Sequence, residues 1–217
     1  MIRIYGHPFA SYYQKVLMAL YENATPFELR MLAPGHEKEG AEFAALWPLR
    51  HMPVLVDGGR TLVEATIIIE HLDLHHPGAQ RFIPAEPDRA LAARFMDRFF
   101  DNYVMTPMQK IVGDSLRKQT DRDAFGVGEA HAVLETSYRW LEDNLRAGQW
   151  AAGDFGLADC AAAPALFYAD WVHPIAPQFP KVIEYRRCLL ARPSFARAVD
   201  EARPYRVHFP LGAPDRD

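Results

Sequence analysis

The stretch HMPVLVDGGRTLVEA, residues 51–65, contains the pattern that decides the fold. Residues 53–56 form a short apolar run that is typical of a buried strand. The Asp-Gly-Gly triplet that follows is a hairpin turn into a second short strand over residues 61–63. From Glu64 the pattern is helical as far as His75, and the His-Pro-Gly sequence after it closes the helix. The stretch therefore predicts a β-hairpin that leads directly into a helix.

The residues before this stretch complete a small sheet. A β-type run at residues 2–5 is followed by a helical pattern over residues 11–23 and by another strand over residues 27–32. A loop and a short helix then connect this strand to the hairpin. A parallel βαβ unit joined to an antiparallel hairpin predicts a mixed four-stranded sheet, and hence an α/β fold for this part.

The rest of the chain shows no strand signal. Proline and glycine punctuate residues 77–87, which predicts a domain boundary there. Helical patterns then cover residues 88–116, 125–146, 157–171, 179–191 and 194–202. The third of these is nearly all apolar, so it should be buried on every side. We expect an α/β domain over residues 1–80 and an all-helical bundle domain over residues 88–217.

The composition excludes several classes of function. The net charge is −4 and the basic residues are scattered, so nucleic acid and anionic membranes are not expected partners. No apolar stretch approaches the ~20 residues that span a bilayer. Cys160 and Cys188 form no ligand spacing, and the pair His75-His76 has no third ligand, so we expect no metal. A soluble, cytoplasmic protein is the expectation.

At this point the motifs resemble a known family. Met52-Pro53-Val54 before the hairpin and Glu64-Ala65 at the next helix are similar to the N-terminal region of bacterial glutathione S-transferases of the Ser or Cys type. The segment FGLADCAAAPAL, residues 155–166, resembles the buried helix of the same family with its capping segment. The resemblance covers nearly the whole chain. It implies a thioredoxin-like first domain, glutathione as co-substrate, a small apolar electrophile as the second substrate, and a homodimer.

The resemblance also implies where glutathione binds. Pro53 would hold a cis peptide bond and expose the backbone of Val54 for strand-like pairing with the cysteinyl unit. The helix start at Glu64 and Ala65 would receive the γ-glutamyl carboxylate, because free N–H groups and the helix dipole attract an anion there. The family usually has Ser where this chain has Ala65. Thr66 follows it, although one residue along a helix turns the side chain by about 100°.

The glycyl carboxylate of glutathione needs a cation in the family, usually a lysine just before Met52. Here that position is His51, which can donate from a neutral ring. His36 and Lys38, on the loop before the second helix, could add positive charge. A solvated surface role for these residues is the alternative reading.

The residue that activates the thiol is less clear. In the segment HPFASYYQKV, residues 7–16, the family's Ser or Cys falls on Ala10, and Ser11 comes next. A hydroxyl there would donate a hydrogen bond to the thiolate and lower the thiol pKa, an effect of about 1.5–3 kcal/mol. Ser11 is the first candidate, with helix N-cap as its alternative role. Tyr12 and Tyr5 are the further candidates, although aromatic residues at such places often only pack.

The electrophile pocket would be lined by aromatic residues and methionine, namely Phe9, Phe99, Tyr103 and Met108. Most of this spacing is also that of a helix core stripe. In the second domain, Gly156 replaces the family's Ser or Thr cap, and Asp159 completes the capping box, so we expect the glycine to be tolerated.

Three functions stay open from the residues. The first is transfer of glutathione to small electrophiles, in the manner of detoxification enzymes. The second is a non-catalytic glutathione-binding or protein-interaction module, which the two missing hydroxyls at Ala10 and Ala65 favour. The third is a glutathione-dependent isomerase or reductase; the absence of a CxxC motif argues only against exchange by the protein's own thiols.

Overall fold

A mixed four-stranded sheet organises the N-terminal part of the computed structural model, which describes all 217 residues. Its strands are β1 (Ile2–Gly6), β2 (Phe27–Met31), β3 (Val54–Asp57) and β4 (Arg60–Leu62). Their order is β2-β1-β3-β4. The β1–β2 pair is parallel and the other two pairs are antiparallel, as the sequence predicted.

Three helices cover this sheet, namely α1 (Ser11–Glu22), α2 (Glu37–Leu46) and α3 (Ala65–His75). Successive strand residues point to opposite faces of a sheet. Ile4 and Leu55 accordingly join the main core with α1 and α3, whereas Tyr5 and Val54 join a small second core with Phe43 of α2. This alternation decides which side chains of β1 and β3 can reach a site on the α1 and α3 face.

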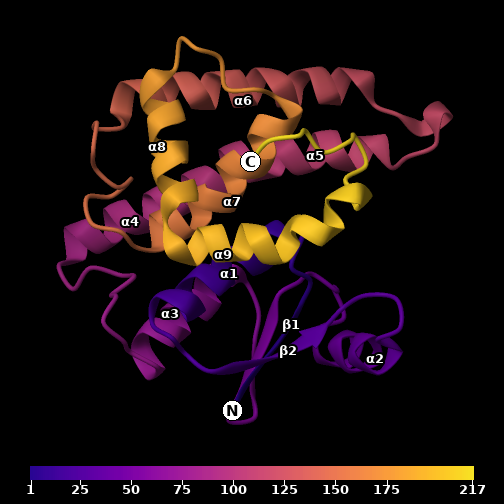
Figure 1. The fold of residues 1–217 in the computed structure, drawn as a ribbon, viewed down its shortest axis with the longest axis vertical. Helices are drawn as coiled ribbons and strands as arrows, with labels where there is room; N and C mark the ends of the chain where they lie inside the picture. Colours follow the sequence, from indigo (N-terminus) through magenta and orange to yellow (C-terminus); the bar gives the residue numbers. More distant parts are fainter.

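The helical domain follows, and Figure 1 shows it above the sheet with α1 at the boundary. Its α-helices are α4 (Pro87–Phe99), α5 (Thr106–Ser115), α6 (Ala124–Asn144), α7 (Leu157–Val172), α8 (Pro180–Ala191) and α9 (Pro193–Ala202). Shorter turns are η1 (Phe100–Met105), η2 (Gln119–Asp121) and η3 (Arg203–His208). None of the helices combines the length and the apolar character needed to cross a membrane.

The long helix expected over residues 88–116 is divided in two by η1, which is a π-helical turn. Pro107 explains the change, because proline has no N–H to donate to the carbonyl four residues earlier. That carbonyl, of Tyr103, instead accepts a hydrogen bond of 2.9 Å from Ser137 Oγ. The division shifts the helical phase between α4 and α5.

Helix α7 lies at the centre of the molecule, and every residue from Leu157 to Trp171 is buried, as the sequence predicted. Its start is fixed by Asp159, whose Oδ2 accepts from Gly156 N at 2.9 Å and whose Oδ1 accepts from Tyr185 Oη at 2.6 Å. Burial raises the pKa of Asp159 to about 6. A Cβ atom on Gly156 would lie 2.6 Å from the carbonyl oxygen of Phe82, so the fold requires glycine here rather than merely tolerating it.

Candidate active site

A cavity of about 710 Å³ lies between the two domains. The first domain supplies the start of α1, the segment 50–53 and the start of α3. The second supplies the junction of α4 and α5, part of α7, and residues 208–210 of the C-terminal segment. Segments distant in sequence therefore meet around a space large enough for a small ligand.

The segment before β3 forms one wall. The Met52–Pro53 peptide bond is cis, and His51, Met52 and Pro53 all line the cavity. Val54 lies just behind them and pairs with Tyr5 of β1. The pairing of β4 begins only at Leu55, so no β4 residue lies opposite Val54. His51 is exposed, together with the neighbouring Arg50, at the rim of the cavity.

The start of α3 forms a second wall, made of Glu64, Ala65 and Thr66. Glu64 is the N-cap and has a φ of +68°, a left-handed conformation that is uncommon for a side chain of this kind. Its side chain makes no capping bond, so the first-turn amides of α3 have no side-chain acceptor. The Thr66 hydroxyl is already occupied: it donates to Asp97 Oδ2 at 2.9 Å and accepts from Lys15 Nζ at 3.0 Å.

Thr66 belongs to an ion cluster that joins the domains. Lys15 Nζ lies 2.6 Å from Asp97 Oδ1 and 2.8 Å from Asp101 Oδ2, and the side chains of Lys15 and Asp97 are 1% and 0% exposed. Arg98 pairs with both carboxylates, so two cations balance two anions. Buried charges persist in proteins when they are paired in this way.

Asp101 has one oxygen to spare. Its Oδ1 is buried and has no hydrogen-bond partner, although the residue lines the cavity. Burial raises the pKa of Asp101, and the Lys15 ammonium opposes that rise. The residue thus offers a desolvated acceptor beside the start of α3.

The start of α1 carries the candidate thiol-activating groups. Ala10 is the N-cap and Ser11 is the first helical residue, so Ser11 does not serve as the cap. The Ser11 hydroxyl has no hydrogen-bond partner within the protein and lines the cavity, as does Tyr12. Burial raises the pKa of Tyr12, which keeps the phenol protonated and able to donate. Gln14 Nε2 bonds to the Pro8 carbonyl oxygen at 2.9 Å and holds the preceding turn.

Tyr5 is not brought to the cavity. Its side chain is 1% exposed and its hydroxyl donates to Glu42 Oε2 at 2.9 Å. The alternation along β1 turns it toward α2, on the opposite face of the sheet from α1. The strand position that suggested Tyr5 is therefore corrected by the direction of its side chain.

Four other predicted site residues also lie elsewhere. His36 and Lys38 are exposed at the start of α2, outside the cavity, and His36 Nδ1 lies 3.8 Å from Glu39 Oε2. Phe99 and Tyr103 border a separate hollow of about 430 Å³ on the helical domain. Phe99 stacks on the Trp140 ring with centroids 4.4 Å apart, which draws it away from the cavity.

Phe9 and Met108 do line the cavity, and they have neighbours that the sequence did not indicate. The Phe9 ring lies 5.5 Å from the Tyr168 ring of α7 and 6.4 Å from the Phe209 ring of the C-terminal segment. Tyr168 Oη donates to the Phe9 carbonyl oxygen at 3.0 Å. No periodic pattern accompanies His208-Phe209-Pro210, so their place in the wall could only be seen in the fold.

Comparison with known proteins agrees with this arrangement. The family model for the N-terminal domain of glutathione S-transferases matches residues 4–80, and the model for the C-terminal domain matches residues 116–188. The chain belongs to the glutathione S-transferase family. The family match confirms the thioredoxin-like N-terminal domain and the helical C-terminal domain.

The relatives of this glutathione S-transferase differ in their stated activity. A probable maleylacetoacetate isomerase of Vibrio cholerae is 28% identical over 214 residues, which cover 93% of this chain and 96% of the relative. The maleylacetoacetate isomerase of Mus musculus is 24% identical and covers 82% of each chain. A glutathione S-transferase structure from Methylobacterium radiotolerans, in complex with glutathione sulfonate, has a TM-score of 0.78 and 28% identity, and covers 91% of this chain and 94% of that one.

Proposed function

We propose that the protein binds glutathione in the interdomain cavity and adds its thiolate to a small electrophile. One observation carries this proposal: the segment before β3, the start of α3 and the unpartnered Ser11 hydroxyl all line one cavity. These three parts are the ones that the recognition of a tripeptide thiol requires. The complex of the Methylobacterium radiotolerans relative with glutathione sulfonate supports the same ligand.

Each part of glutathione would meet a different wall. The γ-glutamyl carboxylate would bind the first-turn amides at Ala65 and Thr66, where the helix dipole is positive. The α-amino group would lie near Glu64 and the free Oδ1 of Asp101. The cysteinyl backbone would pair with Val54 beside the cis-proline, in the manner of an added strand.

The glycyl carboxylate would then reach the rim beside His51. His51 and Arg50 are both exposed there, so each is free to turn toward an anion. His36 and Lys38 are not needed for this contact, because they lie outside the cavity.

Ser11 would activate the thiol by donating a hydrogen bond to its ionised form. A bond to a charged acceptor contributes about 1.5–3 kcal/mol, which corresponds to about one to two pKa units. The N-terminal end of α1 adds a favourable dipole at the same place. Tyr12 is the alternative donor, because its phenol also lines the cavity and stays protonated.

A glutathione-dependent isomerase is a second candidate, favoured by the relatives that match over most of their length. Both reactions begin when the thiolate forms a bond to one carbon of an activated double bond and leaves a carbanion at the neighbouring carbon. In transfer, that carbanion takes a proton and the conjugate is released. In isomerisation, the new single bond rotates and the thiolate is expelled, so glutathione is regenerated.

Calorimetric titration with reduced glutathione at neutral pH tests the shared step. We expect saturable binding at millimolar or tighter affinity and a higher melting temperature with glutathione present. Mass spectrometry of the products of trial electrophiles then separates the two reactions, since only transfer incorporates glutathione. No binding heat and no thermal stabilisation would instead support a scaffold without a glutathione site.

We further propose that the protein is a homodimer that pairs through α3 and α4. Arg94 joins the two helices by bonds of 2.8 and 2.9 Å to Glu70. Large apolar side chains surround this ion pair and are exposed by half or more, namely Ile67, Leu74, Leu91 and Phe95. Such an apolar surface around a polar centre is typical of an interface.

Sedimentation velocity tests the dimer. We expect a dimer for the wild-type chain and a monomer for Leu91→Glu, because the charge would be buried without a partner. Phe125→Glu is the matched control, since Phe125 is 78% exposed on α6, outside α3 and α4. If Leu91→Glu remained dimeric, the interface would have to lie on another face.

A further inference from the structure

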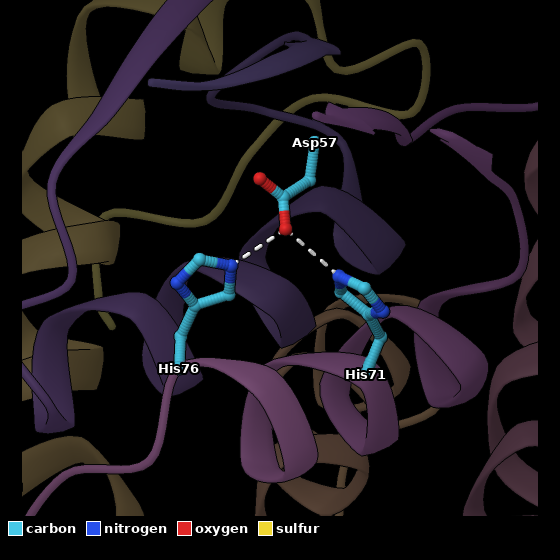
Figure 2. A group of neighbouring side chains, drawn as sticks. All are labelled: Asp57, His71 and His76. Carbon is cyan, nitrogen blue, oxygen red and sulfur yellow. Dashed lines mark hydrogen bonds and ion pairs between the residues drawn. The ribbon is translucent and has the colours of Figure 1, made fainter. Parts of the chain in front are cut away.

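Three potential metal ligands converge on the side of the first domain, where the hairpin turn meets the end of α3. Asp57 is the last residue of β3, His71 lies within α3, and His76 is the C-cap of that helix. Figure 2 shows both imidazole rings turned toward the same carboxylate oxygen. His76 Nε2 lies 2.6 Å and His71 Nε2 lies 3.0 Å from Asp57 Oδ2. All three ligand atoms lie within 4.8 Å of one another.

This convergence was not visible in the sequence. The pair His75-His76 stood alone there, whereas the fold adds His71 from one turn earlier and Asp57 from the hairpin. The His75 ring packs on the His71 ring, with centroids 4.5 Å apart, and His75 is not one of the three converging residues.

The chemistry of the cluster fits a transition metal. Two imidazole nitrogens and one carboxylate oxygen form a ligand set that zinc accepts, with a fourth position left for water. Asp57 forms no ion pair with lysine or arginine; both of its ion-pair partners are these histidines. No fixed cation therefore competes for the carboxylate.

The surroundings fit as well. The side chain of His71 is 8% exposed, that of Asp57 is 21% exposed and that of His76 is 32% exposed. The site is thus partly shielded from water and open on the His76 side, where an ion could enter. The ligands stand on a strand end and on one helix, which hold them in place before any ion arrives.

We propose that Asp57, His71 and His76 form a binding site for a divalent transition metal of the zinc type. Tetrahedral ligands at ~2.0–2.1 Å from zinc lie about 3.3 Å from one another. The two distances at Asp57 Oδ2 need to open by only a fraction of an ångström to admit the ion. Metal binding through Nε2 places the ring proton of each neutral histidine on Nδ1.

The site would stabilise the elements that hold glutathione, a consequence that rests on the proposed function. Strand β3 begins at Val54, beside the cavity, and ends at Asp57. Helix α3 begins at Ala65, on the cavity wall, and ends next to His76. A metal would therefore tie together the far ends of the two elements whose near ends form the cavity.

Metal titration of the purified full chain tests the proposal without glutathione. After treatment with a chelator, the chain is titrated with Zn²⁺ by calorimetry and with Co²⁺ by visible absorption. We expect one ion per chain, a visible Co²⁺ spectrum of the tetrahedral type, and a higher melting temperature with Zn²⁺. Loss of glutathione binding in a separate experiment would leave this result unchanged.

Variants assign the binding to these three residues. His71→Gln, Asp57→Asn and His76→Gln should each weaken Zn²⁺ binding at least about tenfold, since even outer-shell changes at metal sites have effects of that size. His131→Gln is the matched control. His131 belongs to a second histidine pair, with its Nδ1 3.1 Å from His173 Nδ1, and its loss should leave the affinity unchanged.

Two outcomes would overturn the proposal. One is the absence of stoichiometric binding by the wild-type chain, which would make the cluster a hydrogen-bonded link between hairpin and helix. The other is Zn²⁺ affinity that survives in the three cluster variants or falls in His131→Gln. His76 is the most exposed of the three, so His76→Gln provides a folded variant if the change at His71 prevents folding.

Discussion

The Lys15 ammonium lies 2.8 Å from Asp101 Oδ2, so that a buried ion pair links the first helix of one domain to the second domain. The other oxygen of Asp101 has no partner, and Asp101 lines the cavity. One carboxylate therefore serves both the domain boundary and the proposed glutathione site, and the two roles can be tested separately.

The first prediction concerns the free oxygen of Asp101. Asp101→Asn removes the negative charge that we expect the α-amino group of glutathione to meet. A charge-assisted hydrogen bond contributes about 1.5–3 kcal/mol, so the Kd for glutathione should rise about tenfold or more. Calorimetry with glutathione and with its glutaryl analogue, which lacks the amino group, provides the comparison. If the variant weakens both ligands equally, Asp101 acts only through the structure of the domain boundary.

The second prediction concerns the stability of that boundary. Lys15→Met leaves Asp97 and Asp101 buried beside Arg98 alone, which should lower the free energy of unfolding by about 3 kcal/mol. Urea denaturation measures the change. Lys110→Met is the matched control, because the Lys110–Asp123 pair is about 40% exposed and should contribute less than about 1 kcal/mol. Equal effects of the two substitutions would contradict a structural role for the buried pair.

The sequence contained enough information for the sheet, the hairpin and the buried helix α7, because each follows from a local pattern. The position of Lys15 did not follow from such a pattern. A lysine on a helix normally faces water, and only the packing of the second domain against α1 makes this one fully buried. The exposed rim residue His51 and the cavity wall at Glu64 and Ala65 were found through the resemblance of their motifs.

The misplaced pocket residues have a different cause. Phe99, Tyr103 and Met108 were expected on one stripe, which requires an unbroken α-helix. The π-helical turn η1 interrupts that helix, so the residues before Thr106 and those after it no longer share a phase. Met108 consequently lines the cavity, whereas Phe99 and Tyr103 border the hollow beside Trp140. Only Pro107 hinted at the interruption.

The third prediction concerns thiol activation by Ser11. A hydrogen bond to the thiolate lowers the thiol pKa, so Ser11→Ala should raise the pKa of bound glutathione by about one to two units. Activity should then fall at least about tenfold near neutral pH and recover as the pH rises above the new pKa. The thiolate absorbance of bound glutathione, followed against pH, measures the shift.

Tyr12→Phe is the control for that experiment. It removes a phenol from the same cavity wall and should leave the thiol pKa unchanged. A shift in Tyr12→Phe without one in Ser11→Ala would transfer the donor role to Tyr12.

The last prediction separates the sequence rule from the fold at the start of α7. Serine is a better N-cap than glycine, so the sequence alone predicts that Gly156→Ser is neutral or slightly stabilising. The structure predicts a loss of about 1–3 kcal/mol, because a Cβ would lie 2.6 Å from the Phe82 carbonyl oxygen. That carbonyl cannot move freely, since it accepts a hydrogen bond of 3.0 Å from Leu157 N. Gly128→Ala is the control: Gly128 lies within α6 with open space around it, so its substitution should stabilise the protein by about 0.5–1 kcal/mol. Thermal and urea denaturation of both variants give the comparison, and a stable Gly156→Ser would mean that the approach of Phe82 is looser than the fold indicates.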